Sequence, residues 1–261
     1  MLGAAASAAA LVPAPGHAEG DRDEPAKGKS KKRIMVVGAS AMHGALGREI
    51  EQALDAAGYE VTRVTRGSSG LSRPDFFNWP KEAKRTYAKF EPHATVVNFG
   101  GNDAQGLKMP EGHDPPWIRW PEKGWSAEYA KRVVAFANTI APRGEHIFWL
   151  GMPAMESETF DQRILKINRI VTSSLQGRPG AHFVDMRKIL SRKGERCSDS
   201  IVAGGKTIHV REPDGVHITR GGGRHVASKL LPMLDEALER EPEPPVPLPS
   251  LLRLQFTPRA R

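Results

Sequence analysis

The stretch "RIMVVGASAMHGALG", from Arg33 to Gly47, decides the fold of this chain. Its apolar run ends at Gly38, and a small polar turn that carries Ser40 leads into a helical pattern. A turn of this kind either presents a reactive serine or binds the phosphates of a dinucleotide through backbone amides at the helix start. The later motifs of the sequence have to distinguish these two chemistries.

Apolar runs alternate with helical patterns along the chain. The runs expected to form strands are 33–38, 59–65, 94–100, 146–151 and 181–186, and the patterns expected to form helices are 42–57, 80–90, 126–140, 159–175 and 221–239. Strands that are apolar on both faces and alternate with helices are typical of a parallel sheet between two helix layers. The predicted fold class is therefore α/β, with three α/β/α layers and a doubly wound, five-stranded parallel sheet.

The 261 residues divide by composition into four segments. Residues 1–18 are Ala-rich and apolar and end with small residues at Gly16 and Ala18, as a signal peptide does. A polar and basic linker follows at 19–31, one domain of typical size at 32–240, and a Pro-rich tail, expected to be disordered, at 241–261. We therefore expect export, to the periplasm or beyond the cell.

The formal net charge of +8 raises the question of a nucleic-acid partner. Much of this charge lies in the linker and the tail, and no module of interleaved aromatic and basic residues accompanies it, so we expect no nucleic-acid partner. Cys197 is the single cysteine, which precludes an intrachain disulfide. The nine histidines lack the spacing of metal ligands, so no metal or other cofactor is expected, and no stretch after the leader has the length of a membrane span.

A dinucleotide site remains an alternative for the first turn. Gly38, Gly44 and Gly47 lie between a strand and a helix, and arginines near the end of the second strand would suit a 2′-phosphate. However, Ala41 stands where the middle glycine of such a spacing would be, and no Tyr-x-x-x-Lys pair occurs. A Gly-rich turn by itself is weak evidence.

Two later motifs favour the reactive serine. "FGGND", which carries Asn102, follows the third apolar run, and "DGVH", Asp214 to His217, precedes the last helix. If the sheet has the order 2-1-3-4-5, ligands bind at the carboxyl ends of its first and third strands. Ser40 and Asn102 then meet at one rim, together with the loop after the second strand, which contains Gly70.

This set of residues suits acyl transfer. A serine hydroxyl needs a base, and His217 can take its proton near neutral pH while Asp214 fixes the imidazole tautomer. The tetrahedral intermediate carries a negative oxygen that needs preorganised donors. The backbone N–H groups of Ser40 and Gly70 and the side-chain amide of Asn102 are candidates for this oxyanion hole.

At these residues the chain resembles the SGNH/GDSL hydrolase superfamily. Gly38-Ala39-Ser40, Gly70, Gly100-x-Asn102-Asp103 and Asp214-x-x-His217 match its blocks in order, over almost the whole domain. The resemblance implies a flavodoxin-like α/β/α fold, metal-free ester hydrolysis or acyl transfer, and the roles assigned above. One departure is Ala39, where the family usually has Asp.

The segment 105–125 is long for a connection and contains several tryptophans. Because aromatic rings stack on sugars or line acyl pockets, we assign Trp117 and Trp120, with Arg73 near the second block, to substrate binding.

The sequence thus predicts an exported serine esterase whose partner is an acylated small molecule or carbohydrate, with acetyl on a cell-envelope glycan as the proposed ester. An NADP-binding oxidoreductase is one alternative. A non-catalytic relative that only binds its ligand, as Ala39 suggests, is the other.

Overall fold

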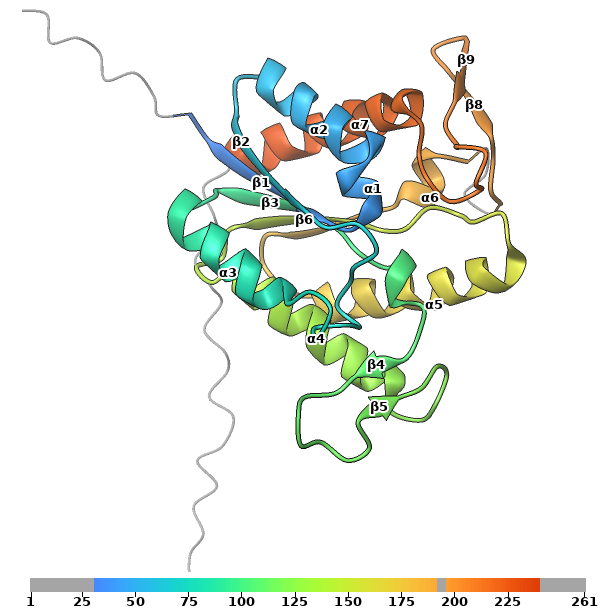
Figure 1. The fold of residues 1–261 in the computed structure, drawn as a ribbon. Helices are drawn as coiled ribbons and strands as arrows, with labels where there is room; N and C mark the ends of the chain where they lie inside the picture. Colours follow the sequence, from blue (N-terminus) through green and yellow to red (C-terminus); the bar gives the residue numbers. More distant parts are fainter. Residues whose placement is uncertain (1–30, 192–195, 240–261) are drawn as a thin grey trace, which may run out of the picture. The chain divides into compact units, whose positions relative to one another are not determined.

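The computed structural model describes residues 31–191 and 196–239 (Figure 1). The leader predicted at 1–18, nearly all of the linker at 19–31 and the tail at 241–261 lie outside the described residues.

A five-stranded parallel sheet forms the centre of the domain. Its strands, in their order across the sheet, are β2 (Glu60–Thr65), β1 (Arg33–Gly38), β3 (Ala94–Asn98), β6 (His146–Leu150) and β7 (Ala181–Val184). Each neighbouring pair is parallel. The predicted order 2-1-3-4-5 and the flavodoxin-like arrangement are confirmed, because these strands are the five apolar runs in the expected sequence.

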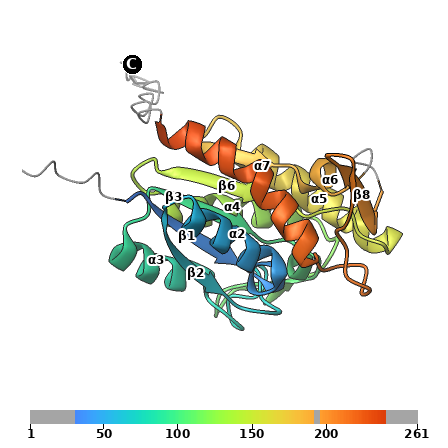
Figure 2. The same ribbon diagram turned by 90° about the horizontal axis from the view of Figure 1, so that it is seen from above.

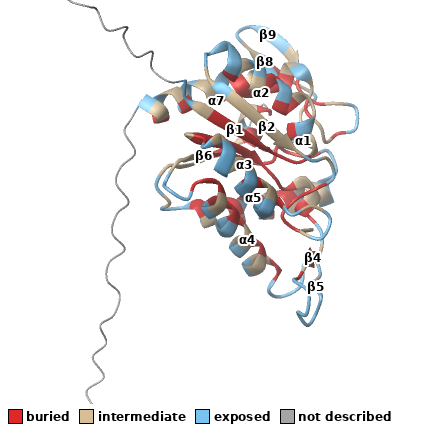
Figure 3. Ribbon diagram, turned by 60° about the vertical axis from the view of Figure 1, so that its left-hand side comes forward, coloured by how far each residue is buried: buried red, intermediate tan, exposed pale blue. Residues whose placement is uncertain are grey.

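The two faces of the sheet bury alternate side chains of the central strands β1, β3 and β6. In β1, Met35 and Val37 pack into one apolar cluster, and Ile34 and Val36 pack into another on the opposite face. The first cluster is covered by α3 (Trp79–Phe90), α4 (Trp125–Ile140) and α5 (Glu158–Leu175), and the second by α2 (Ala45–Ala56) and α7 (Arg220–Glu239). Figure 2 shows α2 and α7 lying side by side over the sheet, and Figure 3 shows the strands buried between helices whose outer faces are exposed.

The prediction of one continuous helix that begins at residue 42 and ends at residue 57 is wrong at its start. The chain forms a single turn, α1 (Ser40–His43), breaks at Gly44, and continues as α2. Gly47 packs directly against the backbone of Met42, where a Cβ atom would overlap the Met42 carbonyl group. The start of α2 thus packs closely on the end of α1, and Ser40 stands at the start of a separate short helix.

Several short elements were not expected from the sequence. These are η1 (Gly101–Asp103), the hairpin of β4 (Leu107–Lys108) and β5 (Trp117–Ile118), α6 (Met186–Ile189) and the hairpin of β8 (Ser200–Ala203) and β9 (Lys206–His209). Among the helices of the described ranges, none combines the length and the apolar character needed to cross a membrane.

Candidate active site

Ser40 lies where β1 passes into α1. Gly38 ends the strand, and a Cβ atom there would lie 2.5 Å from both the Asn98 carbonyl oxygen of β3 and the Met42 side chain. The Ala39 N–H donates to the same Asn98 oxygen at 3.3 Å, so the turn is held against the end of β3. Because Gly38 allows this close approach, the chain passes from β1 into α1 with Ala39 alone between them, and Ser40 is half-buried at the rim.

Two hydrogen bonds join Ser40, His217 and Asp214 in series. The Ser40 Oγ lies 3.0 Å from His217 Nε2, and His217 Nδ1 lies 2.6 Å from Asp214 Oδ2. An ionised carboxylate only accepts hydrogen bonds, so Nδ1 carries the proton and the Nε2 lone pair faces the serine hydroxyl. The structure therefore brings together three residues that the sequence separates by up to 177 positions.

The Asp214 carboxylate also organises its own loop. Its Oδ1 accepts hydrogen bonds from the backbone N–H groups of Val216 and His217, both at 2.8 Å. Gly215 supplies the left-handed backbone (φ 68°) that this turn requires. Partial burial raises the pKa of Asp214, but hydrogen bonds from the His217 side chain and from the two N–H groups outweigh it and lower that pKa to about 2. Asp214 is therefore ionised throughout the neutral range.

The loop after β2 and the η1 turn after β3 are bonded to each other. The Asn102 side-chain amide donates one hydrogen bond to the Ser69 carbonyl oxygen at 3.1 Å, so its second hydrogen stays available. Within the described ranges the Gly70 N–H forms no hydrogen bond. Gly38 pairs with Thr65 of β2 and with Asn98 of β3, so both turns extend from strand ends that flank Ser40.

The Asp103 carboxylate packs directly against Gly70. Its fully buried carboxylate accepts hydrogen bonds from the Ser72 N–H at 2.7 Å and the Tyr129 hydroxyl at 2.9 Å, and a Cβ atom on Gly70 would overlap it. Burial raises the pKa of Asp103, although these hydrogen bonds oppose the rise. The roles of Asp103 and Tyr129 in this anchor were not recognised in the sequence, because a tyrosine that caps a carboxylate from another helix leaves no local motif.

Ala39 occupies an apolar position. Its side chain is buried in the same cluster as Leu71, Phe99 and Met152. A carboxylate here would lose its hydration among these side chains, which is a physical reason for alanine in this chain.

The tryptophans of segment 105–125 differ in their surroundings. Trp117 lies on β5, with the Arg73 guanidinium 5.0 Å and the Lys108 ammonium 5.3 Å from its ring centre. Trp120 packs edge-on against the buried Trp125, at 4.3 Å between ring centres. The substrate-binding role of Trp117, Trp120 and Arg73 stays a prediction.

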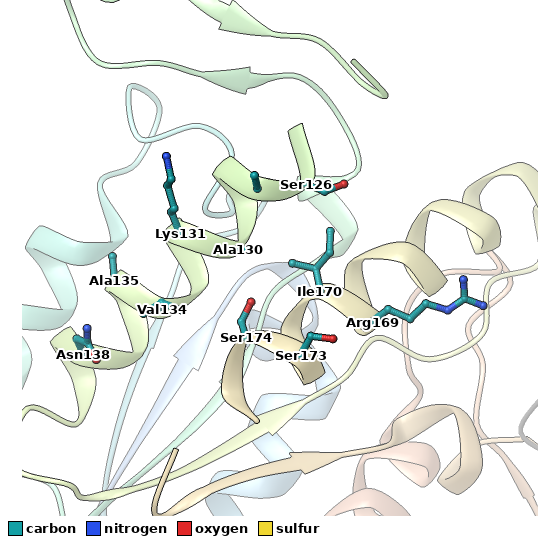
Figure 4. A pocket seen from close by; sticks show the side chains of 11 residues that line it. Ser126, Ala130, Lys131, Val134, Ala135, Asn138, Arg169, Ile170, Ser173 and Ser174 are labelled. Atoms are coloured by element: carbon teal, nitrogen blue, oxygen red, sulfur yellow. The ribbon is translucent and has the colours of Figure 1, made fainter. Parts of the chain in front are cut away.

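Two hollows differ in their relation to this site. One, of about 400 Å³, adjoins the His217 loop and is lined by Ala41, Gly44, Ala45, Arg48, Glu212, Pro213, Asp214, His217 and Ile218. The other, of about 740 Å³, lies between α4 and α5 (Figure 4). Its lining includes Val134 and Ile170 and none of the predicted site residues.

A metal site and a reactive cysteine are the other kinds of functional site that the described residues could form. No group of three His, Cys, Asp or Glu side chains in the described part of the chain is arranged to hold a metal ion. Cys197 is half-buried, and burial raises the pKa of its thiol, which disfavours the reactive thiolate.

Residues 33–233 match a family model described as a protein of unknown function, DUF459. The chain belongs to the DUF459 family. Among curated proteins, no match to the sequence of this DUF459 chain is found.

Solved structures share the fold of the DUF459 chain at low sequence identity. A protein from Slackia heliotrinireducens assigned to the SGNH hydrolases is 15% identical, with a TM-score of 0.53 over 78% of this chain and 99% of that one. A carbohydrate esterase family 3 structure from Talaromyces cellulolyticus is 14% identical, with a TM-score of 0.51 over 80% of this chain and 100% of that one. LAE5, an α/β hydrolase enzyme from the metagenome of Lake Arreo, is 11% identical, with a TM-score of 0.52 over 77% of this chain and 94% of that one. The predicted resemblance to SGNH hydrolases is thus confirmed for the fold of the DUF459 chain.

Proposed function

We propose that this protein is a serine esterase that uses Ser40 as nucleophile, His217 as base and Asp214 as the residue that orients the base. The observation that carries the proposal is the pair of hydrogen bonds, 3.0 Å and 2.6 Å long, that links these three side chains. A serine adjacent to an oriented imidazole is the arrangement that activates an alcohol for attack on an acyl carbon.

The first half of the reaction forms an acyl-enzyme. The Ser40 Oγ attacks the ester carbonyl carbon while His217 Nε2 takes the hydroxyl proton. Asp214 stabilises the resulting imidazolium, and its low pKa keeps it ionised in this role. The intermediate then expels the alcohol, which receives the proton from Nε2.

Three donors stabilise the oxyanion in this proposal. The Ser40 N–H stands at the first position of α1, where a helix leaves its N–H groups without an intrahelical acceptor. The Gly70 N–H and the second hydrogen of the Asn102 amide are the other two donors. Removal of one such donor typically costs about 3 kcal/mol of barrier stabilisation.

The second half releases the acyl group. A water molecule gives a proton to His217 Nε2 and attacks the acyl carbon, and the proton then returns to Ser40 Oγ as the acid leaves. An alcohol in place of water would give acyl transfer by the same steps.

The test is the intact mass after exposure to a fluorophosphonate. We expect one adduct on the wild-type protein and none on Ser40→Ala, because only an activated serine reacts. If the folded wild type forms no adduct, the esterase proposal is wrong. The non-catalytic and oxidoreductase alternatives are then separated by whether NADPH raises the melting temperature.

For the substrate we propose an O-acetyl group on a carbohydrate of the cell envelope. The Talaromyces relative in fold is a carbohydrate esterase, and Trp117 offers a half-exposed ring beside Arg73. If this ring stacks on a sugar, Trp117→Ala raises KM for acetylated oligosaccharide several-fold and leaves p-nitrophenyl acetate hydrolysis unchanged. Equal loss on both substrates would contradict the sugar contact.

We also propose export, on the composition of residues 1–18 alone. The amino-terminal sequence of the protein recovered outside the cytoplasmic membrane tests it, with cleavage after Ala18 as the expected result.

A further inference from the structure

The residues from Arg211 to Ile218 form a closed turn, here named the His217 loop. Arg211 and Ile218 pair across its base as an antiparallel bridge, and the Glu212 N–H donates to the His217 carbonyl oxygen at 2.9 Å. These bonds fix the internal shape of the loop. They do not fix the loop against the rest of the domain, and therefore do not by themselves direct His217 toward Ser40.

Arg211 supplies a contact of this second kind. Its guanidinium donates from one nitrogen to the Val216 carbonyl oxygen at 2.7 Å, next to His217, and from another to the Ala154 carbonyl oxygen at 2.6 Å. Ala154 lies in the connection between β6 and α5, 57 residues away. The Arg211 side chain thus joins the His217 loop to the segment that follows β6, beside a longer backbone hydrogen bond of 3.4 Å from the Glu156 N–H to the Gly215 carbonyl oxygen.

The segment that receives Arg211 is itself firmly held. Asn168 of α5 accepts from the Met152 N–H at 2.9 Å and donates to the Met152 carbonyl oxygen at 2.8 Å. Asp161 accepts from the Met155 N–H at 2.8 Å and pairs with Arg187. Ala154, between these two anchors, is therefore a fixed reference point.

Arg211 is a buried residue, not a mobile side chain on the surface. Only 6% of the residue is exposed, and among the described residues no carboxylate lies within ion-pair distance of it and its Nε–H has no hydrogen-bond partner. A buried cation without an anion is costly, and an apolar residue of similar size would avoid that cost. The two carbonyl contacts are what an apolar residue cannot provide.

We propose that Arg211 is a positioning residue, which holds the His217 imidazole in line with Ser40 and Asp214 by tying Val216 to Ala154. The proposal rests on the proposed esterase function. Lysine cannot fully replace Arg211, because an ammonium group lacks the planar guanidinium whose N–H groups point at two carbonyl oxygens in fixed directions. Small misplacements of a catalytic group, of about 1 Å, can cost about 100-fold in rate.

The test compares Arg211→Met with Arg178→Met. Arg178 also donates to two backbone carbonyl oxygens, those of Ala137 and Ala141, but it lies near the start of β7, at the opposite end of the sheet from Ser40. We expect Arg211→Met to lower kcat for p-nitrophenyl acetate about 100-fold with KM within a few-fold, and Arg178→Met to leave kcat unchanged. Arg211→Lys should recover part of kcat.

A readout that does not depend on activity is the proton NMR signal of the His217 Nδ1–H, which the 2.6 Å bond to Asp214 shifts strongly downfield. We expect Arg211→Met to lose or broaden this signal and Arg178→Met to keep it. The signal is present without turnover, so its loss in Arg211→Met supports the positioning role even if the wild type hydrolyses no ester. A wild type without ester hydrolysis would overturn only the proposed function. If Arg211→Met does not fold, Arg211→Lys replaces it in both measurements. Retention of the signal together with wild-type kcat in a folded Arg211 variant would overturn the proposal.

Discussion

Two of the hollows in the described part of the domain differ in size and in the side chains that line them. The one between α4 and α5 is the larger, at about 740 Å³, and is lined mainly by small and apolar side chains such as Ala130 and Val134 (Figure 4). The one beside the His217 loop measures about 400 Å³ and contains Asp214 and His217. Size and apolar character favour the first as a ligand site, whereas the second is lined by two of the three residues of the hydrogen-bonded series, Asp214 and His217.

The difference lies in how each hollow is made. The hollow between α4 and α5 is a space between two neighbouring helices, and its lining side chains come from these two helices alone. The site around Ser40 combines the turn after β1 with the His217 loop, whose side chains are joined by a hydrogen bond, and the turns after β2 and β3 leave neighbouring strand ends. Convergence of polar groups held by hydrogen bonds, more than volume, therefore indicates where a reaction is catalysed. The experiments below test this contrast, from the largest expected effect to the smallest.

His217→Ala should abolish ester hydrolysis. Without the imidazole, the Ser40 hydroxyl has no acceptor for its proton, and loss of such a base typically costs about 10⁶-fold in kcat. Steady-state kinetics with p-nitrophenyl acetate measure the effect. Hydrolysis at the wild-type rate would show that the hydrogen-bonded series is not the catalytic centre.

Asp214→Asn should lower kcat for p-nitrophenyl acetate by about 10⁴-fold, because an amide can hold the wrong imidazole tautomer.

The same variant also tests the Asp214 pKa of about 2, through the pH dependence of the free energy of unfolding. A depressed carboxyl pKa stabilises the folded state above the unfolded value of about 4, and this contribution is lost as the pH falls toward 2. Urea unfolding of both proteins should therefore show a wild-type advantage that is constant at neutral pH and shrinks between about pH 4 and pH 2. An advantage independent of pH in that window would contradict the assigned pKa.

Asn102→Ala should lower kcat by about 100-fold, or about 3 kcal/mol, with a smaller change in KM. The amide stabilises charge that exists only in the transition state, so binding of the ester is less affected. Asn102→Asp is the matched control for size, and it should be at least as slow because its charge repels the oxyanion. A loss confined to KM would indicate a ground-state contact instead.

Val134→Ser and Ile170→Ser, in the hollow between α4 and α5, should leave kcat and KM for p-nitrophenyl acetate within about 2-fold of wild type. Val134 is 40% exposed and Ile170 is partly buried, so neither change opens a large cavity. Thermal unfolding checks that the variants are folded. A loss of activity comparable to that of Asn102→Ala would remove the distinction between the two hollows.

The strands and their order could be predicted from the sequence because the central strands are continuous apolar runs and helical patterns separate all five. The run at 146–151, for example, becomes β6, buried on both faces. His217 and Asp214 could be assigned only from their motif and its chemistry. Ser40, Asn102 and the loop with Gly70 could be placed at one rim because a doubly wound sheet puts the ends of its first and third strands side by side. Their meeting in space follows from topology, although their distances do not.

The remaining features leave little trace in the sequence. β4 and β5 have two residues each, too few for any periodicity. The break at Gly44 depends on the contact of Gly47 with Met42, which a helical pattern does not reveal. Arg211 acts on backbone carbonyl oxygens, and since every residue has one, no partner residue type marks its role.

The contact between Gly70 and Asp103 also has a consequence for the history of the family. The Asp103 carboxylate fills the place that a side chain at position 70 would need, and both residues are buried. A side chain at position 70 therefore requires the Asp103 carboxylate to move, and we expect substitution of Gly70 to be tolerated best where a smaller residue has replaced Asp103. The two positions should change together among relatives, in that order, and lineages that have lost Asp103 should be the ones in which Gly70 is free to vary.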